Sequence, residues 1–162
     1  IWAVGEDMKR NVPLIYHWNG RRWKRIAAAE RPAGWTYHGF RAVAARTASD
    51  IWAFGLLARS DDLQLLIQHW DGQAWRHAAA IPFPGISWTW NLDVQGAVAM
   101  GPNDAWVVGN AGVDTGTGVF ALHWDGSTWS QTALPPETTS DSRRNLLLSV
   151  RTRNGRSVNC LT

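Results

Sequence analysis

The segment HWDGQAW, at residues 69–75, indicates the architecture of this chain, because two close copies of it occur elsewhere in the sequence. They read HWNGRRW at 17–23 and HWDGSTW at 123–129. In each copy an apolar run ends in Trp, an Asn-Gly or Asp-Gly pair follows, and a second Trp comes soon after. Asn or Asp followed by Gly favours the positive φ values of a tight hairpin turn. We therefore predict a β-hairpin with a two-residue turn at each copy.

The predicted turn sets the register of each hairpin. In the first copy it places Trp18 opposite Arg21 and Tyr16 opposite Trp23. Trp18 and Trp23 are then diagonal neighbours on one face, within reach of two aromatic rings. The same geometry is expected for the pairs Trp70–Trp75 and Trp124–Trp129.

A second repeated sequence motif, which we call the D-x-W phrase, precedes each hairpin. It reads IWAVG at 1–5, DIWAFG at 50–55 and DAWVVG at 104–109. Its Trp residues are spaced by 50 and 54 positions, and the hairpin His residues by 52 and 54. Two independent markers with nearly one period indicate an internal repeat.

Each complete repeat contains four short strand candidates, and no stretch has a sustained helical period. In the second repeat they are Phe40–Arg46, Ile51–Leu57, Leu63–Trp70 and Ala74–Ala80; in the third they are Ala97–Met100, Ala105–Asn110, Gly118–Trp124 and Thr128–Ala133. Four antiparallel strands repeated at this length are typical of a β-propeller blade. We predict an all-β fold, a partial β-propeller of about three four-stranded blades plus a partial unit. The expected units are 1–30, 38–80, 93–135 and, for the partial one, 145–162.

The two ends do not coincide with complete blades. The chain opens on what would be the second strand of a blade, and its last segment lacks the Asp-x-Trp phrase. Propellers usually close with four to eight blades, so the favoured interpretation is a fragment of a larger ring. In the alternative, residues 145–150 complete the first unit by strand exchange.

Both phrases together resemble the Trp-rich propeller repeats of secreted or surface proteins in actinobacteria and related bacteria. The pattern D-x-W-A-V-G, then H-W-D-G and a returning Trp, covers about residues 1–133. This resemblance implies a propeller fold and an extracellular or cell-surface setting, but no particular activity. The hairpin is more distantly similar to the Asp-box of sialidase-like propellers, although the residue between Asp and Gly is missing. The chain is also distantly similar to tectonin-type lectins.

Composition limits the partners. The 16 basic residues against 13 acidic ones give a net charge of +3, but the bases are scattered, which disfavours a nucleic-acid partner. No apolar run is long enough for a membrane helix. The single cysteine, Cys160, excludes a disulfide within the chain. We expect no cofactor, and the sequence does not indicate an oligomeric state.

The repeated polar residues are interpreted as structural. His17, His69 and His123 occupy one repeated position, which a propeller would spread over separate blades, so they are not expected to share a metal ion. We expect each ring to bond a carbonyl or a turn aspartate such as Asp50 or Asp104. Asp71 and Asp125 offer too few oxygens for calcium, so we predict no metal site.

Four aromatic residues and one adjacent histidine are not explained by the repeat. They are Trp35, Tyr37, His38, Trp88 and Trp90. They lie between units, on the propeller face that also carries the loops within 5–13, 57–63 and 110–118. Such rings suit sugar stacking or a protein contact, although they could instead fill gaps between blades. The expected function is extracellular recognition of a glycan or protein, or a scaffold role. The alternative is a fragment of a catalytic, sialidase- or glycosidase-like propeller whose active residues lie mainly outside this chain.

Overall fold

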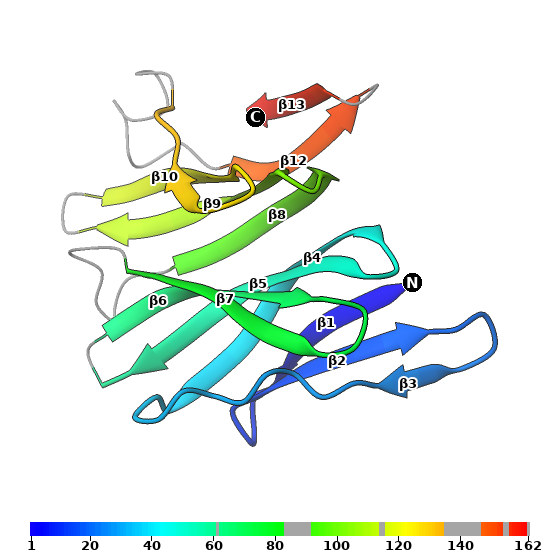
Figure 1. Cartoon of the computed structure of the whole chain (residues 1–162). Coiled ribbons are helices and arrows are strands. Elements are labelled where there is room, and N and C mark those ends of the chain that lie inside the picture. Colours follow the sequence, from blue (N-terminus) through cyan, green and yellow to red (C-terminus); the bar gives the residue numbers. More distant parts are fainter. Residues whose placement is uncertain (61, 83–91, 114–115, 135–146, 154–155, 162) are drawn as a thin grey trace.

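The computed structural model describes residues 1–60, 62–82, 92–113, 116–134, 147–153 and 156–161. Every regular element in these ranges is a β-strand. Figure 1 shows the strands gathered into sheets that follow one another along the chain. The predicted all-β class is confirmed. The described residues form no closed propeller.

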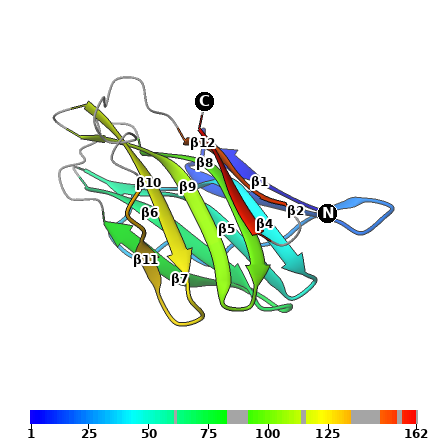
Figure 2. The ribbon, with the colours of Figure 1, turned by 90° about the horizontal axis from the view of Figure 1, so that it is seen from above.

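The sheets are antiparallel and use strands in sequence order. Sheet 1 contains β1 (Trp2–Asp7), β2 (Val12–Trp18) and β3 (Trp23–Arg25). Sheet 2 contains β4 (Tyr37–Thr47), β5 (Asp50–Arg59), β6 (Asp62–Trp70) and β7 (Trp75–Pro82). Sheet 3 contains β8 (Leu92–Gly101), β9 (Asp104–Val113), β10 (Gly116–Trp124) and β11 (Trp129–Gln131), and sheet 4 contains β12 (Leu147–Arg153) and β13 (Arg156–Leu161). Figure 2 shows strands of sheets 2 and 3 running side by side from above.

The apolar core lies between consecutive sheets. Ile15 of sheet 1 packs with Ile51 and Leu66 of sheet 2, and all three are fully buried. On its other face, sheet 2 packs Leu65 against Phe120 of sheet 3. Sheet 2 is thus covered on both faces, which explains why the consecutive residues Leu65, Leu66 and Ile67 of β6 are all buried instead of alternating between buried and exposed.

The predicted two-residue hairpin turn is wrong. Trp18 pairs directly with Trp23, not with Arg21, and four residues lie between them. The side chain of Asn19 explains the longer turn, because its Oδ1 accepts hydrogen bonds from the backbone N–H groups of Arg21 and Arg22. An Asx turn of this kind bonds the residues two and three positions after the Asn or Asp, so it needs the longer loop. Within this turn the positive φ, of 97°, is taken by Gly20.

The other two hairpins share this corrected register. Trp70 pairs with Trp75, and Trp124 pairs with Trp129. Asp71 accepts from the N–H of Ala74 at 2.8 Å, and this bond is the largest cause of a lowered pKa at the Asp71 carboxyl. The carboxylates therefore act as turn formers, as expected from the sequence.

Tryptophan rings repeat the same contact at two junctions, between sheets 1 and 2 and between sheets 2 and 3. Trp2 of sheet 1 lies 5.3 Å from Trp70 and 5.7 Å from Trp75 of sheet 2, measured between ring centroids. Trp52 of sheet 2 makes the equivalent contacts with sheet 3, at 5.2 and 5.3 Å, with Trp124 and Trp129. Tilted and edge-on contacts at these distances suit aromatic rings. The repeated tryptophans therefore hold successive sheets together.

The structural role predicted for two hairpin histidines is confirmed. His69 Nε2 lies 2.8 Å from Asp50 Oδ1, and His123 Nε2 lies 3.0 Å from Asp104 Oδ1. The His69 ring also lies 4.3 Å from the ring of Trp52, its partner on β5. The Asp, Trp and His of the two repeated phrases thus form one local cluster on neighbouring strands.

The D-x-W phrase ends in glycine because, in sheets 2 and 3, the backbone of the inner strand leaves no room for a side chain. A Cβ on Gly55 would lie 1.9 Å from the carbonyl oxygen of Gly39, and one on Gly109 would lie 2.1 Å from that of Asp93. In both sheets the inner strand has a bulge here, between Phe40 and Ala42 in sheet 2. A bulge brings the two backbones close, and glycine leaves room for that approach.

Candidate functional site

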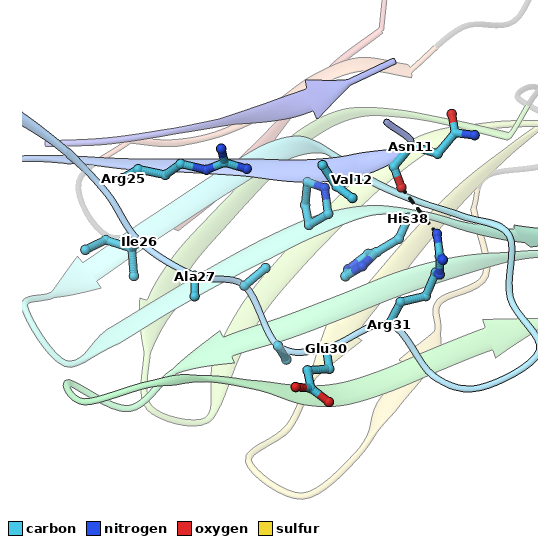
Figure 3. A pocket seen from close by; sticks show the side chains of 11 residues that line it. Asn11, Val12, Arg25, Ile26, Ala27, Glu30, Arg31 and His38 are labelled. Atoms are coloured by element: carbon cyan, nitrogen blue, oxygen red, sulfur yellow. Dashed lines mark hydrogen bonds between the residues drawn. The ribbon is translucent and has the colours of Figure 1, made fainter. Parts of the chain in front are cut away.

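A cleft of about 280 Å³ opens beside sheet 1, and we call it the His38 cleft. It is lined by Asn11, Val12 and Pro13, by the segment 25–31, and by His38. Figure 3 shows the His38 ring between the start of β2 and the segment that carries Ala27 and Glu30. The cleft thus combines the loop between β1 and β2 with the connection from β3 to β4.

His38 forms the buried end of the cleft. The residue is 2% exposed, and its Nε2 lies 3.2 Å from the amide nitrogen of Gln68. Since that amide can only donate, His38 Nε2 accepts, and its ring proton lies on Nδ1. Burial, followed by the charges of His77 and Arg31, lowers the pKa of His38 to about 4. His38 is therefore neutral at physiological pH and presents a polar but uncharged surface.

Gln68 ties one wall of the cleft to sheet 2. Its Oε1 accepts from the backbone N–H of Ala29 at 3.0 Å, and its Nε2 donates to the Ala29 carbonyl at 3.4 Å. Beside it, His77 Nε2 donates to the carbonyl of Glu30. Ile26 N–H donates to the carbonyl of Ile15 at 2.9 Å. These bonds fix the irregular segment 25–31 against two sheets, so the cleft is preformed.

Arg31 joins the two loops that frame the cleft. Its Nη1 donates to the carbonyl of Thr36 at 3.0 Å and to that of Asn11 at 3.5 Å. The second of these bonds appears as the dashed line in Figure 3. Asn11 adopts a positive φ of 53°, a conformation that asparagine tolerates better than most residues. Arg31 is therefore a positioning residue, whereas the exposed Arg25 and Glu30 present charges at the cleft.

Of the residues proposed from sequence, only His38 lines this cleft. Trp35 is partly buried against the core between sheets 1 and 2, and the guanidinium of Arg59 lies 4.7 Å from its ring centroid. Tyr37 packs toward sheet 3, on the opposite face of β4 from His38. Trp88 and Trp90 fall outside the described residues. The binding role of these residues remains a prediction.

Sequence reasoning missed Asn11, Arg25, Glu30 and Arg31. Residues 30 and 31 belong to an irregular connection that the repeat does not explain, and this was the available signal. The fold was needed to bring Asn11 to the same place, because it lies 20 positions before Arg31 in the chain.

Tyr37 belongs to a small polar network instead. Its hydroxyl accepts from Arg41 Nη2 at 3.3 Å, and Arg41 Nη1 lies 2.7 Å from Glu6 Oε1. The second oxygen of Glu6 is buried and has no hydrogen-bond partner among the described residues. The network connects β1 to the inner strand of sheet 2.

A second cleft, of about 540 Å³, lies between sheets 2 and 3. Trp52 and Trp124 form its aromatic part. Burial alone would raise the pKa of Asp50 at its edge, but hydrogen bonds from His69 and Arg46 outweigh burial and lower it. Asp50 and His69 are bonded to each other, and the indole N–H of Trp52 is buried without a hydrogen-bond partner among the described residues.

Comparisons with protein-family models, with curated proteins and with solved structures find no match. Among the described residues, no group of three His, Cys, Asp or Glu side chains is placed to hold a metal ion. In the same part of the chain, no helix has the length and apolarity to cross a membrane. The function must therefore be argued from the geometry.

Proposed function

We propose that this chain is a recognition module that binds a small polar ligand in the His38 cleft, and that this ligand is a glycan. The observation that carries the proposal is the meeting of two loops around a preformed, partly charged hollow. Preformed clefts with a few convergent polar groups are the usual form of a small-molecule site. At about 280 Å³ the cleft matches one sugar ring better than an extended chain.

The chemistry of the cleft favours a hydroxyl-rich ligand. Arg25 supplies donors and Glu30 supplies acceptors at its mouth, while neutral His38 lies at its buried end. Val12, Pro13 and Ile26 provide apolar surface for the less polar face of a sugar.

This binding role fits a wider proposal about the fold. Consecutive antiparallel sheets packed face to face, joined by the D-x-W and H-W-D-G phrases, are consistent with blades of a β-propeller related to the Trp-rich bacterial repeats. In that arrangement the cleft lies on the loop face, between the first and second blades. An extracellular or cell-surface setting follows from the same resemblance.

The test is binding of the 162-residue chain to an array of neutral and acidic saccharides. Arg25→Ala and Glu30→Ala should weaken binding about tenfold or more, since each removes a charged hydrogen-bonding group. Lys24→Ala is the matched control, because Lys24 is exposed on the same short strand but does not line the cleft. Absence of any saccharide binding, or equal loss in the control, would refute the proposal. Binding of a protein through the same residues would redirect it.

A second candidate is a fragment of a catalytic propeller, and the Tyr37–Arg41–Glu6 network favours it. A tyrosine hydroxyl beside an arginine and a carboxylate offers a starting point for a glycosidase-like site. Hydrolysis of fluorogenic sialosides and glucosides, lost in Tyr37→Phe but retained in Tyr16→Phe, would support this candidate. Absence of turnover in the wild-type chain would count against it.

A further inference from the structure

The first hairpin carries a positive charge that the other two hairpins lack. Its residues 21–25 include three arginines and one lysine but no acidic residue. The arginine positions can be compared between hairpins, because the paired tryptophans fix the register. These positions hold Arg21, Arg22 and Arg25 in the first hairpin, Gln73, Ala74 and His77 in the second, and Ser127, Thr128 and Gln131 in the third. We call the three residues of the first hairpin the arginine tip, and its charge is not part of the repeat.

The turn of the first hairpin also lacks the negative charge of its counterpart in sheet 2. Asn19 accepts the same two backbone bonds that Asp71 accepts there, so the turn keeps its shape without a carboxylate. Asp71 in addition binds a cation, because its Oδ2 accepts from Arg76 Nε at 2.7 Å. Among the described residues, no carboxylate forms an ion pair with the arginine tip. Its charges are therefore free to bind an anionic ligand.

The arginine tip is open to solvent. All three of its residues are exposed, and Figures 1 and 2 show the β2–β3 hairpin extending beyond the other strands. Five of the six counterparts in the other hairpins are exposed as well, although a tryptophan of the preceding sheet packs against each of those hairpins. Packing of a neighbouring sheet at this place therefore leaves the equivalent positions accessible.

The arginine tip is continuous with the His38 cleft. Arg25 ends β3 and also lines the cleft, where Figure 3 shows its side chain extending along β2 toward Val12. Side chains alternate along a strand, so Lys24 points away from the face on which Arg25 lines the cleft. Arg21 and Arg22 lie in the turn just before β3. A ligand that fills the cleft and continues past Arg25 along the hairpin thus reaches the other two arginines.

The two parts of this surface suit different chemical groups. The cleft offers Glu30 and neutral His38 to the hydroxyl groups of a sugar. The arginine tip suits carboxylates, because a guanidinium donates two parallel hydrogen bonds to one carboxylate. A lipid surface supplies negative charge but no group that fills a cleft of about 280 Å³, and a nucleic acid carries few hydroxyl groups. A polysaccharide of uronic acids carries hydroxyls and carboxylates together.

We propose that the glycan bound in the His38 cleft is an acidic polysaccharide: one sugar occupies the cleft, and carboxylates of neighbouring sugars bind the arginine tip. This inference rests on the proposed function, since it takes the cleft as the glycan site. The charge distribution supports it. Residues 1–31 contain seven basic and three acidic residues, whereas the remaining 131 contain nine and ten. The excess positive charge therefore lies in the part of the chain that carries the cleft, where it attracts a polyanion.

The probe is a galacturonate decasaccharide, titrated into the complete chain and followed by calorimetry. The comparison ligand is the same decasaccharide after methyl esterification, which removes its charge and keeps its sugar rings. The acidic form should bind about tenfold more tightly at low salt, because it adds ion pairs at three exposed arginines. Raising the salt concentration from about 0.05 M to about 0.5 M should remove most of this difference, because salt screens exposed charges.

The double variant Arg21→Gln, Arg22→Gln is the decisive one. It removes two charges from the arginine tip and leaves the backbone bonds of the turn in place. It should weaken binding of the acidic form about fivefold or more and leave binding of the esterified form unchanged. The matched control is Lys9→Gln, Arg10→Gln, which removes the same charge from exposed residues of the β1–β2 loop that do not line the cleft. This control should change either affinity by less than about twofold.

The outcomes separate this inference from the proposed function. Equal affinities for the two forms, both reduced in Glu30→Ala, would overturn the acidic ligand and keep the cleft as a glycan site. Binding of the acidic form that Glu30→Ala leaves unchanged, or no binding of either form, would overturn both. Equal losses in the two double variants would overturn the inference, as would tighter binding of phosphatidylserine vesicles or single-stranded DNA through the arginine tip.

Discussion

Replacing the glycine of each D-x-W phrase by alanine tests the packing of the sheets most directly. Ordinary contact with a Cβ begins at 3.4 Å, so alanine at position 55 overlaps the Gly39 carbonyl by 3.4 − 1.9 = 1.5 Å. At position 109 the overlap with the Asp93 carbonyl is 3.4 − 2.1 = 1.3 Å. The nearest obstructing atom is a backbone oxygen at both positions, so the inner strand itself must move; at position 109 the Phe120 ring, at 2.7 Å, must move as well.

Overpacking that forces backbone shifts costs about 1–3 kcal/mol and sometimes more. We expect Gly55→Ala and Gly109→Ala to lower the free energy of unfolding by about 3 kcal/mol each. For a chain of this length that corresponds to roughly 6–12 °C in thermal midpoint. Gly5→Ala is the matched control. It should be neutral or stabilising by up to about 1 kcal/mol, because it reduces the entropy of the unfolded chain.

The assay is urea unfolding of the three variants and the wild type, followed by tryptophan fluorescence and circular dichroism. Coincident curves from the two probes check that a single transition is being compared. If Gly5→Ala and Gly55→Ala unfold within about 1 kcal/mol of each other, the close approach of the inner strand is not what requires glycine. The reasoning for both strands would then fail.

Three further predictions concern the buried histidine, the aromatic junction and the hairpin turn. The pKa of His38 is about 4 when folded against 6.5 when exposed, so the unfolded chain binds more protons between these values. Stability should therefore be greatest above about pH 7 and fall by about 2–3 kcal/mol toward pH 4, with a smaller loss in His38→Gln measured by urea midpoints. Trp52→Ala should lower the free energy of unfolding by about 3–5 kcal/mol, measured by thermal or urea unfolding. Trp23→Ala, at a residue that is 49% exposed, should lower it by under about 1 kcal/mol. Similar losses in the two variants would contradict the junction contact. Asp71→Asn should retain the thermal midpoint and Asp71→Ala should lower it, because the Asn19 amide oxygen accepts the same pair of backbone bonds in the first hairpin.

Repetition made much of the architecture predictable. The spacing of Trp2, Trp52 and Trp106 indicated consecutive β units, and the structure contains sheets at those places. The pairing of His69 with Asp50 was also accessible, because a buried ring nitrogen needs a partner and a turn aspartate was the nearest repeated one. Local patterns succeed where each strand and its partner are close in the chain.

The hairpin register and the cleft could not be obtained in this way. Asn19 and Gly20 allow more than one turn, and the side-chain bonds to Arg21 and Arg22 select the longer one. The neutral state of His38 likewise depends on burial beneath residues from other parts of the chain.

The amino-acid pattern was sufficient for the all-β class, the repeat and the structural role of the H-W-D-G histidines, because these depend on contacts between neighbouring strands. The assembled fold was needed to show that a Cβ at Gly55 would meet another backbone and one at Gly5 would not, since only the approach of a second strand distinguishes two identical residues. It was also needed to bring Asn11, Arg31 and His38 around one cleft. Those contacts depend on how whole sheets pack, which the local sequence around each residue does not encode.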